Sequence, residues 1–261
     1  LAARGAVFVE DIADIPEGAV TVFSAHGVST AVVESARARG LKVIDATCPL
    51  VTKVHLQAQR YSQRGYTIVV VGHAEHEEVE GTRGSVNGPV QVVGTLEEIA
   101  ALPMSRDEPV AYVTQTTLSM NDTRELIAAL EERYPDIVGP GLEDICYATM
   151  NRQRAVQQLA RRVDLIIVVG AHNSSNSNRL QEVAADSGVP AWLVEDEREV
   201  QPIWLEGVGS VGLTAGASTP EYLVRRVSEK LTELGAASVR ELPGLAETVR
   251  FRLPDSLSQA G

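Results

Sequence analysis

The stretch "DLIIVVGAHNSSNSNRL", from Asp164 to Leu180, places five apolar residues before a glycine and then a run of small polar residues. A continuous aliphatic and β-branched run of this length is typical of a strand buried on both faces, as in a parallel sheet. Asn173 to Asn178 follow where that strand passes into a helix. Because ligands of open α/β sheets bind beyond the carboxyl ends of the strands, the stretch predicts both a parallel sheet and a polar site.

The alternation of strand and helix continues along the whole chain. Short β-branched runs predict further strands at 20–23, 41–45, 67–71, 90–93, 110–113, 191–194 and 210–213. Amphipathic stretches predict helices at 29–40, 51–65, 121–135, 151–163 and 218–235. Strands that alternate with helices are typical of α/β domains with mainly parallel sheets, and this is the fold class that we expect.

An internal repeat divides this pattern. The segments "DATCPLVTKVHLQAQRYSQRGYTIVVVGH" and "DICYATMNRQRAVQQLARRVDLIIVVGAH" both run from aspartate through cysteine, helix and strand to glycine. Cys48 precedes Gly72 by 24 residues, and Cys146 precedes Gly170 by the same distance. The turn "SAHGVST" resembles "TAGAST" of the second copy, so we expect it to close a further unit, whose own cysteine would lie about 40 positions before Leu1.

The repeat therefore predicts three similar α/β domains arranged as a pseudo-threefold trefoil, with the first domain truncated. Their expected ranges are 1–48 for the remnant of the first domain, 49–143 for the second domain, 144–219 for the third, and 220–261 for a C-terminal helix and tail.

The composition excludes several classes of protein. The chain has 261 residues, of which 44% are hydrophobic, and no apolar run approaches the roughly 20 residues of a membrane-spanning helix. Its formal charge of -12, without clustered Lys and Arg, argues against a nucleic-acid-binding surface. Two cysteines 98 residues apart are too sparse for a disulfide framework. We expect a cytoplasmic protein that binds neither nucleic acid nor membrane.

Polar turns follow the predicted strands in every unit, and in a closed trefoil all of them would face one cavity. The turns are "SAHGVS", "GHAEHEEVEG", "TQTTLS", "AHNSSNSN" and "TAGAST". Ser and Asn are compact donors that can surround phosphate oxygens together with the free N–H groups of a helix N-terminus. The polar run is therefore interpreted as an anion-binding turn. Its alternative is a helix cap followed by a turn, which the same residues favour.

The cysteines allow two interpretations. A single cysteine in such a chain is more often a buried small apolar residue. Cysteines at equivalent positions of three repeats can instead converge as thiolates, and three thiolates suit an iron-sulfur cluster better than zinc because one iron is left open for substrate.

The turn "GHAEHEEVEG" gathers His73, His76, Glu78 and Glu80 at one strand end. Histidine and glutamate in a partly desolvated pocket can have pKa values near neutrality, which suits proton delivery. A divalent metal site of the His-x-x-His kind is the alternative. We expect this segment to be a loop, since it shows no helical pattern.

Seven motifs occur in order along nearly the whole chain: "SAHGVS", "DATCPLVTKVH", "GHxxHxEVEG", "TQTTLS", "DICYATxNRQ", "NSSNSNRL" and "TAGAS". Together they resemble the LytB/IspH family of 4-hydroxy-3-methylbut-2-enyl diphosphate reductases of the non-mevalonate (MEP/DOXP) isoprenoid pathway. The resemblance implies a trefoil around a central 4Fe-4S cluster held by one cysteine per domain. It also implies reductive removal of the allylic hydroxyl of the diphosphate substrate, giving isopentenyl and dimethylallyl diphosphates, with ferredoxin or flavodoxin as the electron donor.

Residue by residue, the resemblance implies three sets of site residues. Cys48 and Cys146 would be cluster ligands. Glu78 would be the proton source, with His76 and Thr116 beside it at the substrate hydroxyl. The contacts to the diphosphate would come from His26, Ser174, Ser175, Asn176 and Ser218.

The chain also departs from the family pattern. Glu77 stands where proline is common, Met150 stands where a small polar residue is usual, and the motif that holds the first cluster ligand is missing. We therefore expect an N-terminally incomplete reductase that neither retains a cluster nor turns over as it stands. The alternatives are a cluster-bearing hydratase and a non-catalytic protein that binds a phosphorylated metabolite.

Overall fold

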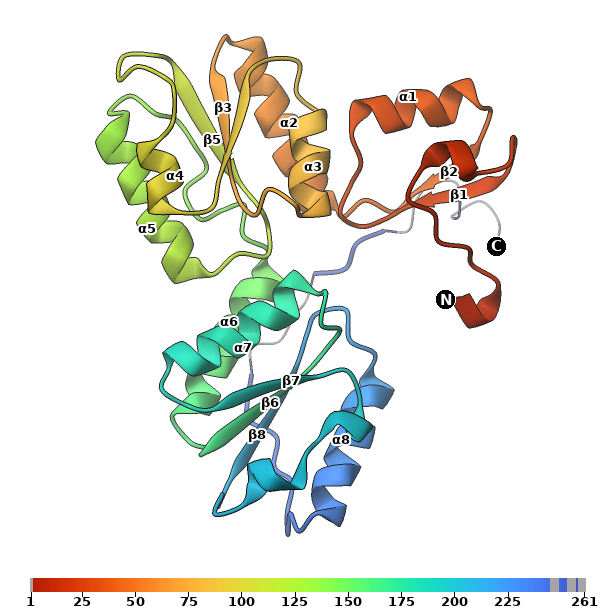
Figure 1. Cartoon of the computed structure of the whole chain (residues 1–261), viewed down its shortest axis with the longest axis vertical. Coiled ribbons are helices and arrows are strands. Elements are labelled where there is room, and N and C mark those ends of the chain that lie inside the picture. Colours follow the sequence, from red (N-terminus) through yellow and green to blue (C-terminus); the bar gives the residue numbers. More distant parts are fainter. Residues whose placement is uncertain (1, 245–248, 253–256, 258–261) are drawn as a thin grey trace. The chain divides into compact units, whose positions relative to one another are not determined.

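The computed structural model describes residues 2–244, 249–252 and 257, and it shows an α/β fold with three separate parallel sheets (Figure 1). The first sheet pairs β1 (Val20–Phe23) with β2 (Lys42–Asp45). The second has the order β4-β3-β5, and the third has the order β7-β6-β8. The fold class predicted from the sequence, α/β with mainly parallel sheets, is confirmed.

The two three-stranded sheets are built alike. In the second sheet the strands are β3 (Thr67–Val71), β4 (Val90–Val93) and β5 (Val110–Thr114). In the third they are β6 (Leu165–Val169), β7 (Ala191–Val194) and β8 (Val211–Ala215). All five residues of each central strand, β3 and β6, are buried, as expected for parallel strands covered by helices on both faces.

Helices connect these strands. The longer ones are α1 (Thr30–Ala38), α2 (Pro49–Gln63), α3 (Glu77–Gly84), α5 (Met120–Arg133), α6 (Tyr147–Ala160), α7 (Ser175–Asp186) and α8 (Glu221–Glu233). The short elements are α4 (Leu96–Ala100) and the 3-10 helices η1 (Ala2–Arg4), η2 (Ile12–Asp14), η3 (Glu197–Glu199) and η4 (Pro202–Leu205). Among the described residues, no helix is long and apolar enough to cross a membrane.

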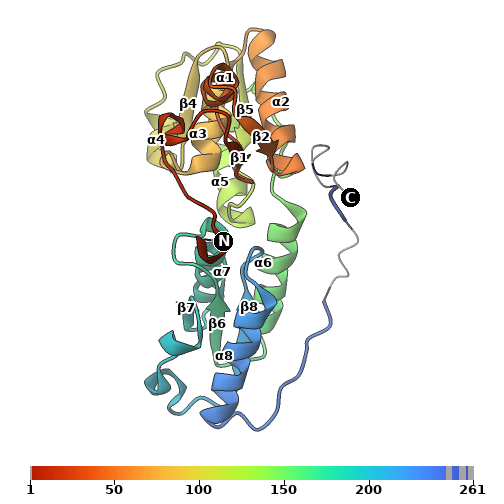
Figure 2. The same ribbon diagram turned by 90° about the vertical axis from the view of Figure 1, so that its right-hand side faces the viewer.

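The described residues divide into two compact units (Figure 2). Unit 1 takes its residues from the ranges 1–115, 123–144 and 249–261, and it holds the first two sheets. Unit 2 takes its residues from 116–122 and 145–248, and it holds the third sheet. The domain boundaries at 48, 143 and 219 stay predictions from the repeat.

Aliphatic clusters hold each sheet to its helices. In unit 1, Val54 and Ala58 of α2 pack with Ile68 and Val70 of β3. In unit 2, Val156 of α6 belongs to the equivalent cluster on one face of the third sheet. A fully buried Val or Ile side chain contributes about 1.5–3 kcal/mol to folding, so the clusters fix the sheets from which the polar turns extend.

One prediction for the polar turns is wrong. The segment from Gly72 to Gly81 is not a loop throughout, because α3 begins at Glu77. The helix begins there since His76 caps it and acidic residues fill its first turn, where they complement the helix dipole. Only one apolar side chain, Val79, lies in α3, so the sequence showed no helical periodicity.

Candidate functional site

Cys48 and Cys146 occupy equivalent positions in the repeat. Each is the N-cap residue of a long helix, Cys48 with φ -57° and ψ 131° and Cys146 with φ -56° and ψ 132°. The backbone N–H of Cys48 donates to the carbonyl of Ala25 at 3.0 Å, and that of Cys146 donates to the carbonyl of Thr116 at 2.9 Å. Cys48 is therefore joined to the polar turn after β1, and Cys146 to the polar turn after β5.

Both thiols are suited to bind a metal cluster. Neither sulfur is in a disulfide, neither caps its own helix with a side-chain hydrogen bond, and both residues are half-buried. The cysteines lie in different units. In the described part of the chain no three His, Cys, Asp or Glu side chains are grouped to hold a metal ion.

In unit 1 the predicted histidines lie together. The rings of His26, in the turn after β1, and His76, at the N-terminus of α3, meet edge to face with centroids 5.6 Å apart. Nδ1 of His26 lies 2.8 Å from the Oε2 atom of Glu77. The turn "SAHGVS" and the turn "GHAEHEEVEG", far apart in sequence, thus form one histidine and carboxylate cluster.

The tautomer of His76 follows from its role as a helix cap. Its Nδ1 accepts a hydrogen bond from the backbone N–H of Glu78 at 3.1 Å, so the ring proton of the neutral form is on Nε2. Burial, followed by the charges of His26 and His73, lowers the pKa of His76, and Glu77 opposes this shift. His76 is thus favoured as a neutral donor through Nε2.

Glu78 is buried, with 2% of its surface exposed, although it follows the exposed Glu77. The first turn of α3 places these two carboxylates on different sides of the helix. A buried glutamate beside a histidine cluster is a group that can hold a proton away from bulk water, as proton delivery requires.

Gln115 fixes the turn that carries these groups. Its Oε1 accepts the backbone N–H of His73 at 3.1 Å, and the residue is 2% exposed. Gly72 allows this approach, because a Cβ there would lie 2.7 Å from Cγ2 of Val79 and 3.0 Å from Oε1 of Gln115. The glycine that ends the repeat is therefore needed for close packing of the turn.

In unit 2 the polar run forms the N-terminus of α7. Ser174 is the N-cap residue, and its Oγ accepts the N–H of Ser177 at 3.3 Å and the hydroxyl of Ser177 at 3.1 Å. The side-chain amide of Asn178 donates to the carbonyls of His172 and Ser174. Capping thus accounts for Ser174, as the alternative interpretation of the run required.

Capping does not account for Asn176. This residue is 7% exposed, and neither its Nδ2 nor its Oδ1 has a hydrogen-bond partner among the described residues. An unpaired buried amide costs about 1–3 kcal/mol, so proteins rarely keep one without a use. Asn176 lies in the first turn of α7, where free N–H groups favour an anion.

Two glycines bring neighbouring turns against the same helix end. A Cβ on Gly170, after β6, or on Gly216, after β8, would lie 2.2 Å from Oγ of Ser177. The turn that carries Ser218 therefore packs directly on the N-terminus of α7, and Ser218 itself is exposed. Unit 2 thus brings together Ser174, Ser175, Asn176 and Ser218, whereas His26, His76 and Glu78 belong to unit 1.

The turn after β5 joins unit 2 through residues 116–122. Thr116 is buried, with 5% exposed, and its carbonyl accepts the N–H of Cys146. The hydroxyl of Thr117 lies 3.0 Å from that of Ser175 at the start of α7. The predicted site residue Thr116 is thus adjacent to a predicted cluster ligand.

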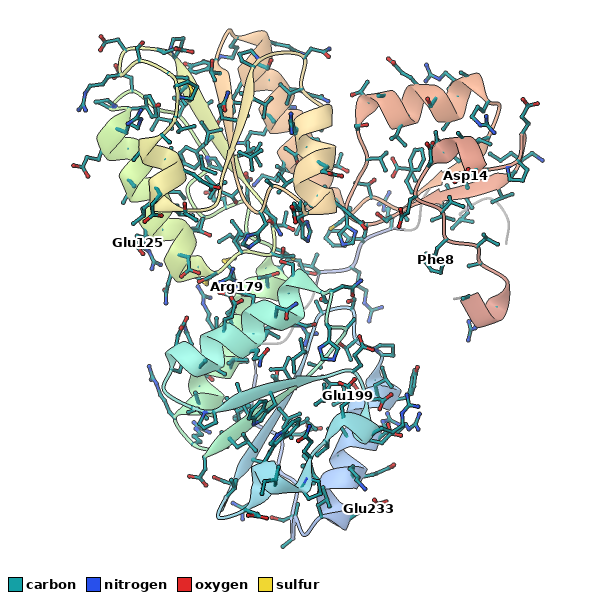
Figure 3. All side chains as sticks on the ribbon, in the orientation of Figure 1. Phe8, Asp14, Glu125, Arg179, Glu199 and Glu233 are labelled. Atoms are coloured by element: carbon teal, nitrogen blue, oxygen red, sulfur yellow. The ribbon has the colours of Figure 1, made fainter. Side chains whose placement is uncertain are left out.

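Sequence reasoning missed Glu77, Gln115 and Ser177 as parts of the site. The position of Gln115 at the end of β5, within the motif "TQTTLS", is the signal that was available for it. No local pattern marks Glu77 as a partner of His26, since 51 residues separate them. The other side chains of unit 2, including Arg179 of α7 and Glu199 of η3, are drawn in Figure 3.

Comparison with known proteins gives a family match over most of the chain. The model of the family described as "LytB protein" matches residues 1–232. A 4-hydroxy-3-methylbut-2-enyl diphosphate reductase of Zymomonas mobilis is 53% identical over 257 residues, which are 98% of this chain and 76% of that protein. The 4-hydroxy-3-methylbut-2-enyl diphosphate reductase 1 of Rhodopseudomonas palustris is 54% identical over 260 residues, which are 100% of this chain and 85% of that protein.

Solved structures are similar as well. The E-1-hydroxy-2-methyl-but-2-enyl-4-diphosphate reductase of Plasmodium falciparum has a TM-score of 0.95 and 34% identity, over 99% of this chain and 82% of that one. A second structure, described as (E)-4-hydroxy-3-methyl-but-2-enyl diphosphate reductase, the terminal enzyme of the non-mevalonate pathway, has a TM-score of 0.58 and 36% identity, over 88% of this chain and 82% of that one.

Proposed function

This chain belongs to the LytB protein family, and on that premise we propose that it is an oxidoreductase acting on (E)-4-hydroxy-3-methylbut-2-enyl diphosphate. The reaction removes the allylic hydroxyl and yields isopentenyl and dimethylallyl diphosphates, the last step of the non-mevalonate pathway. The observation that carries the proposal is the buried and unpartnered amide of Asn176 in the first turn of α7.

The diphosphate is bound by local donors. Asn176 Nδ2, in the first turn of α7, is the proposed donor for phosphate oxygens, and Ser175 and Ser218 are proposed to supply hydroxyls. In unit 1, His26 is the proposed contact. The formal charge of -12 does not oppose this, because charges more than about 10 Å away are largely screened at physiological salt.

Cys48 and Cys146 are the proposed ligands of an iron-sulfur cluster, since both thiols are free and start equivalent helices. When bound, the cluster supplies the two electrons that the reduction consumes, received from ferredoxin or flavodoxin. Because these 261 residues contain two cysteines where the family uses three ligands, we expect the chain as it stands to hold a cluster poorly and not to turn over.

The side chains of unit 1 handle the protons. Replacing the C–OH bond by C–H consumes two electrons and two protons and releases water. Glu78, buried beside the histidine cluster, is the proposed donor to the leaving oxygen. His76, with its ring proton on Nε2, is a proposed contact to the substrate hydroxyl, and Thr116, which belongs to unit 2, is another. The second proton goes to the allylic carbon framework.

The test compares the 261-residue chain with a version extended at its N-terminus by a segment that supplies a third cysteine. Both are loaded anaerobically with iron and sulfide and assayed with reduced viologen, while products are separated by chromatography. We expect viologen oxidation and both isoprenoid diphosphates from the extended version only, with Glu78→Gln lowering the rate by at least about 100-fold and Glu80→Gln leaving it nearly unchanged.

Three outcomes would contradict parts of this proposal. Turnover without consumption of reducing equivalents would identify a hydratase. Calorimetric binding of the allylic diphosphate by the extended version without turnover would identify a binding protein. Brown colour and activity in the 261-residue chain itself would disprove the expected need for a third cysteine.

A further inference from the structure

The hydrogen bond between His26 and Glu77 joins two turns of unit 1, and the proposed reaction assigns it no role. Nδ1 of His26 lies 2.8 Å from Oε2 of Glu77, and the two side chains are 48% and 72% exposed. An exposed pair of this kind contributes little to folding. Its effect on the histidine ring, by contrast, is specific, because a carboxylate accepts hydrogen bonds and does not donate them.

We propose that Glu77 is a positioning residue that holds the proton of His26 on Nδ1 and leaves Nε2 available to a phosphate oxygen of the ligand. This inference rests on the proposed function only for the identity of the ligand. The hydroxyl of Ser24 lies 3.5 Å from the same Nδ1, too far to compete with a carboxylate at 2.8 Å. As an imidazolium, the ring donates to Glu77 through Nδ1 and to a phosphate oxygen through Nε2 at the same time.

The neighbouring histidine is fixed in the opposite way. Nδ1 of His76 accepts the N–H of Glu78, so its ring proton is on Nε2, whereas Nδ1 of His26 faces a carboxylate. The two rings lie 5.6 Å apart. Two consecutive residues of α3 thus act on the two rings. The backbone N–H of Glu78 sets the ring proton of His76 on Nε2, and the side chain of Glu77 is proposed to set the ring proton of His26 on Nδ1.

Substitution of Glu77 by proline tests this role directly, because it removes the carboxylate and is compatible with the start of α3. Glu77 is the first residue of α3, where an N–H needs no partner within the helix and proline is well tolerated. Residue 76 before it already has φ -85° and ψ 132°, the extended conformation that a following proline requires. Glu77→Pro therefore removes the carboxylate while preserving the helix start.

NMR of the ring nitrogens reports which nitrogen of each of the five histidines is protonated. It is recorded for the wild-type chain, Glu77→Pro, Glu77→Gln and the control Glu80→Gln. His26 and His76 are assigned by single substitution of each histidine. At a pH where the rings are neutral we expect His26 to be protonated on Nδ1 in the wild-type chain and in Glu80→Gln, and mainly on Nε2 in Glu77→Pro. His76 should be protonated on Nε2 in every variant.

Binding of inorganic pyrophosphate is measured by calorimetry on the same proteins. At a pH where both ring nitrogens of His26 are protonated, we expect about two- to fivefold weaker binding for Glu77→Pro and Glu77→Gln. Glu80→Gln should change the affinity less than twofold, because one exposed charged contact contributes little. Unchanged His26 nitrogens in Glu77→Pro, or unchanged affinity, would overturn the role of Glu77. Absence of pyrophosphate binding by the wild-type chain would count against the proposed function, and the His26 nitrogens would still decide the role of Glu77.

Discussion

Gly216 approaches Ser177 so closely that a Cβ on the glycine would lie 2.2 Å from the serine hydroxyl. The turn after β8 can pack on the N-terminus of α7 only because the side chain is missing. We expect Gly216→Ala to lower the free energy of unfolding by about 1–3 kcal/mol, as overpacking does. Urea unfolding measures this, with Gly209→Ala as the matched control, because a Cβ at Gly209 meets Asp164 Oδ2 at an ordinary 3.4 Å.

A double substitution separates the close contact from other causes. Removing the Ser177 hydroxyl in Gly216→Ala/Ser177→Ala should recover part of the loss, since the nearest remaining Ser177 atom, Cβ, would lie 3.5 Å away. If the double variant loses as much free energy of unfolding as the two single variants together, the contact with Ser177 is not the cause.

Asn176 is expected to contribute to pyrophosphate binding and not to the free energy of unfolding. Asn176→Ala removes an unpartnered buried amide, so the free energy of unfolding should not fall, while pyrophosphate affinity should drop about tenfold or more. Ser177→Ala, which removes a hydroxyl that donates to Ser174, should instead lower stability by about 1 kcal/mol. Thermal unfolding and calorimetry on the same samples check both, and a clear loss of stability in Asn176→Ala would contradict this account.

Lys53 supports a carboxylate that is wholly buried. Its Nζ lies 3.4 Å from Oδ1 of Asp144, whose side chain is 0% exposed, and it donates to the carbonyl of Glu143 at 3.0 Å. Lys53→Met would leave the charge of Asp144 unpaired, so we expect the free energy of unfolding to fall by about 1–3 kcal/mol. This is less than the loss for a fully buried pair, because the Lys53 side chain is itself 45% exposed. Chemical unfolding checks this against Lys42→Met, an exposed lysine of β2, whose stability should change by less than about 0.5 kcal/mol.

His55 should make folding sensitive to mild acid. Burial lowers its pKa below 6.5, opposed in part by Asp45, and its Nε2 has no partner in the described part of the chain. Below pH 6.5 the His55 ring takes up a proton more readily in the unfolded chain than in the folded chain. The stability that comes from keeping His55 neutral is therefore complete above pH 6.5, and it is lost as the pH falls toward the pKa of His55 in the folded chain. Urea unfolding at several pH values should give a shallower acid slope for His55→Leu than for the wild-type chain; equal slopes would exclude His55 as the cause.

The sequence alone determined the strands and the class of the fold. Every predicted strand occurs within one or two residues of its expected range, because β-branched runs such as Leu165–Val169 are too apolar to lie anywhere but in a covered sheet. The repeat also placed Cys48 and Cys146 at equivalent helix starts, as their matching torsions show. These features depend on residues close together in the chain, and local patterns report them.

Only the tertiary structure decided how the polar side chains are used. The six small residues from Asn173 to Asn178 look alike in sequence, yet Ser174 caps the helix while Asn176 is buried without a partner, because the turns at Gly170 and Gly216 cover that helix end. The pairing of His26 with Glu77 joins residues 51 positions apart, and the start of α3 depends on a cap by His76 instead of on apolar spacing. Contacts of this range arise from packing between elements, which no local pattern records.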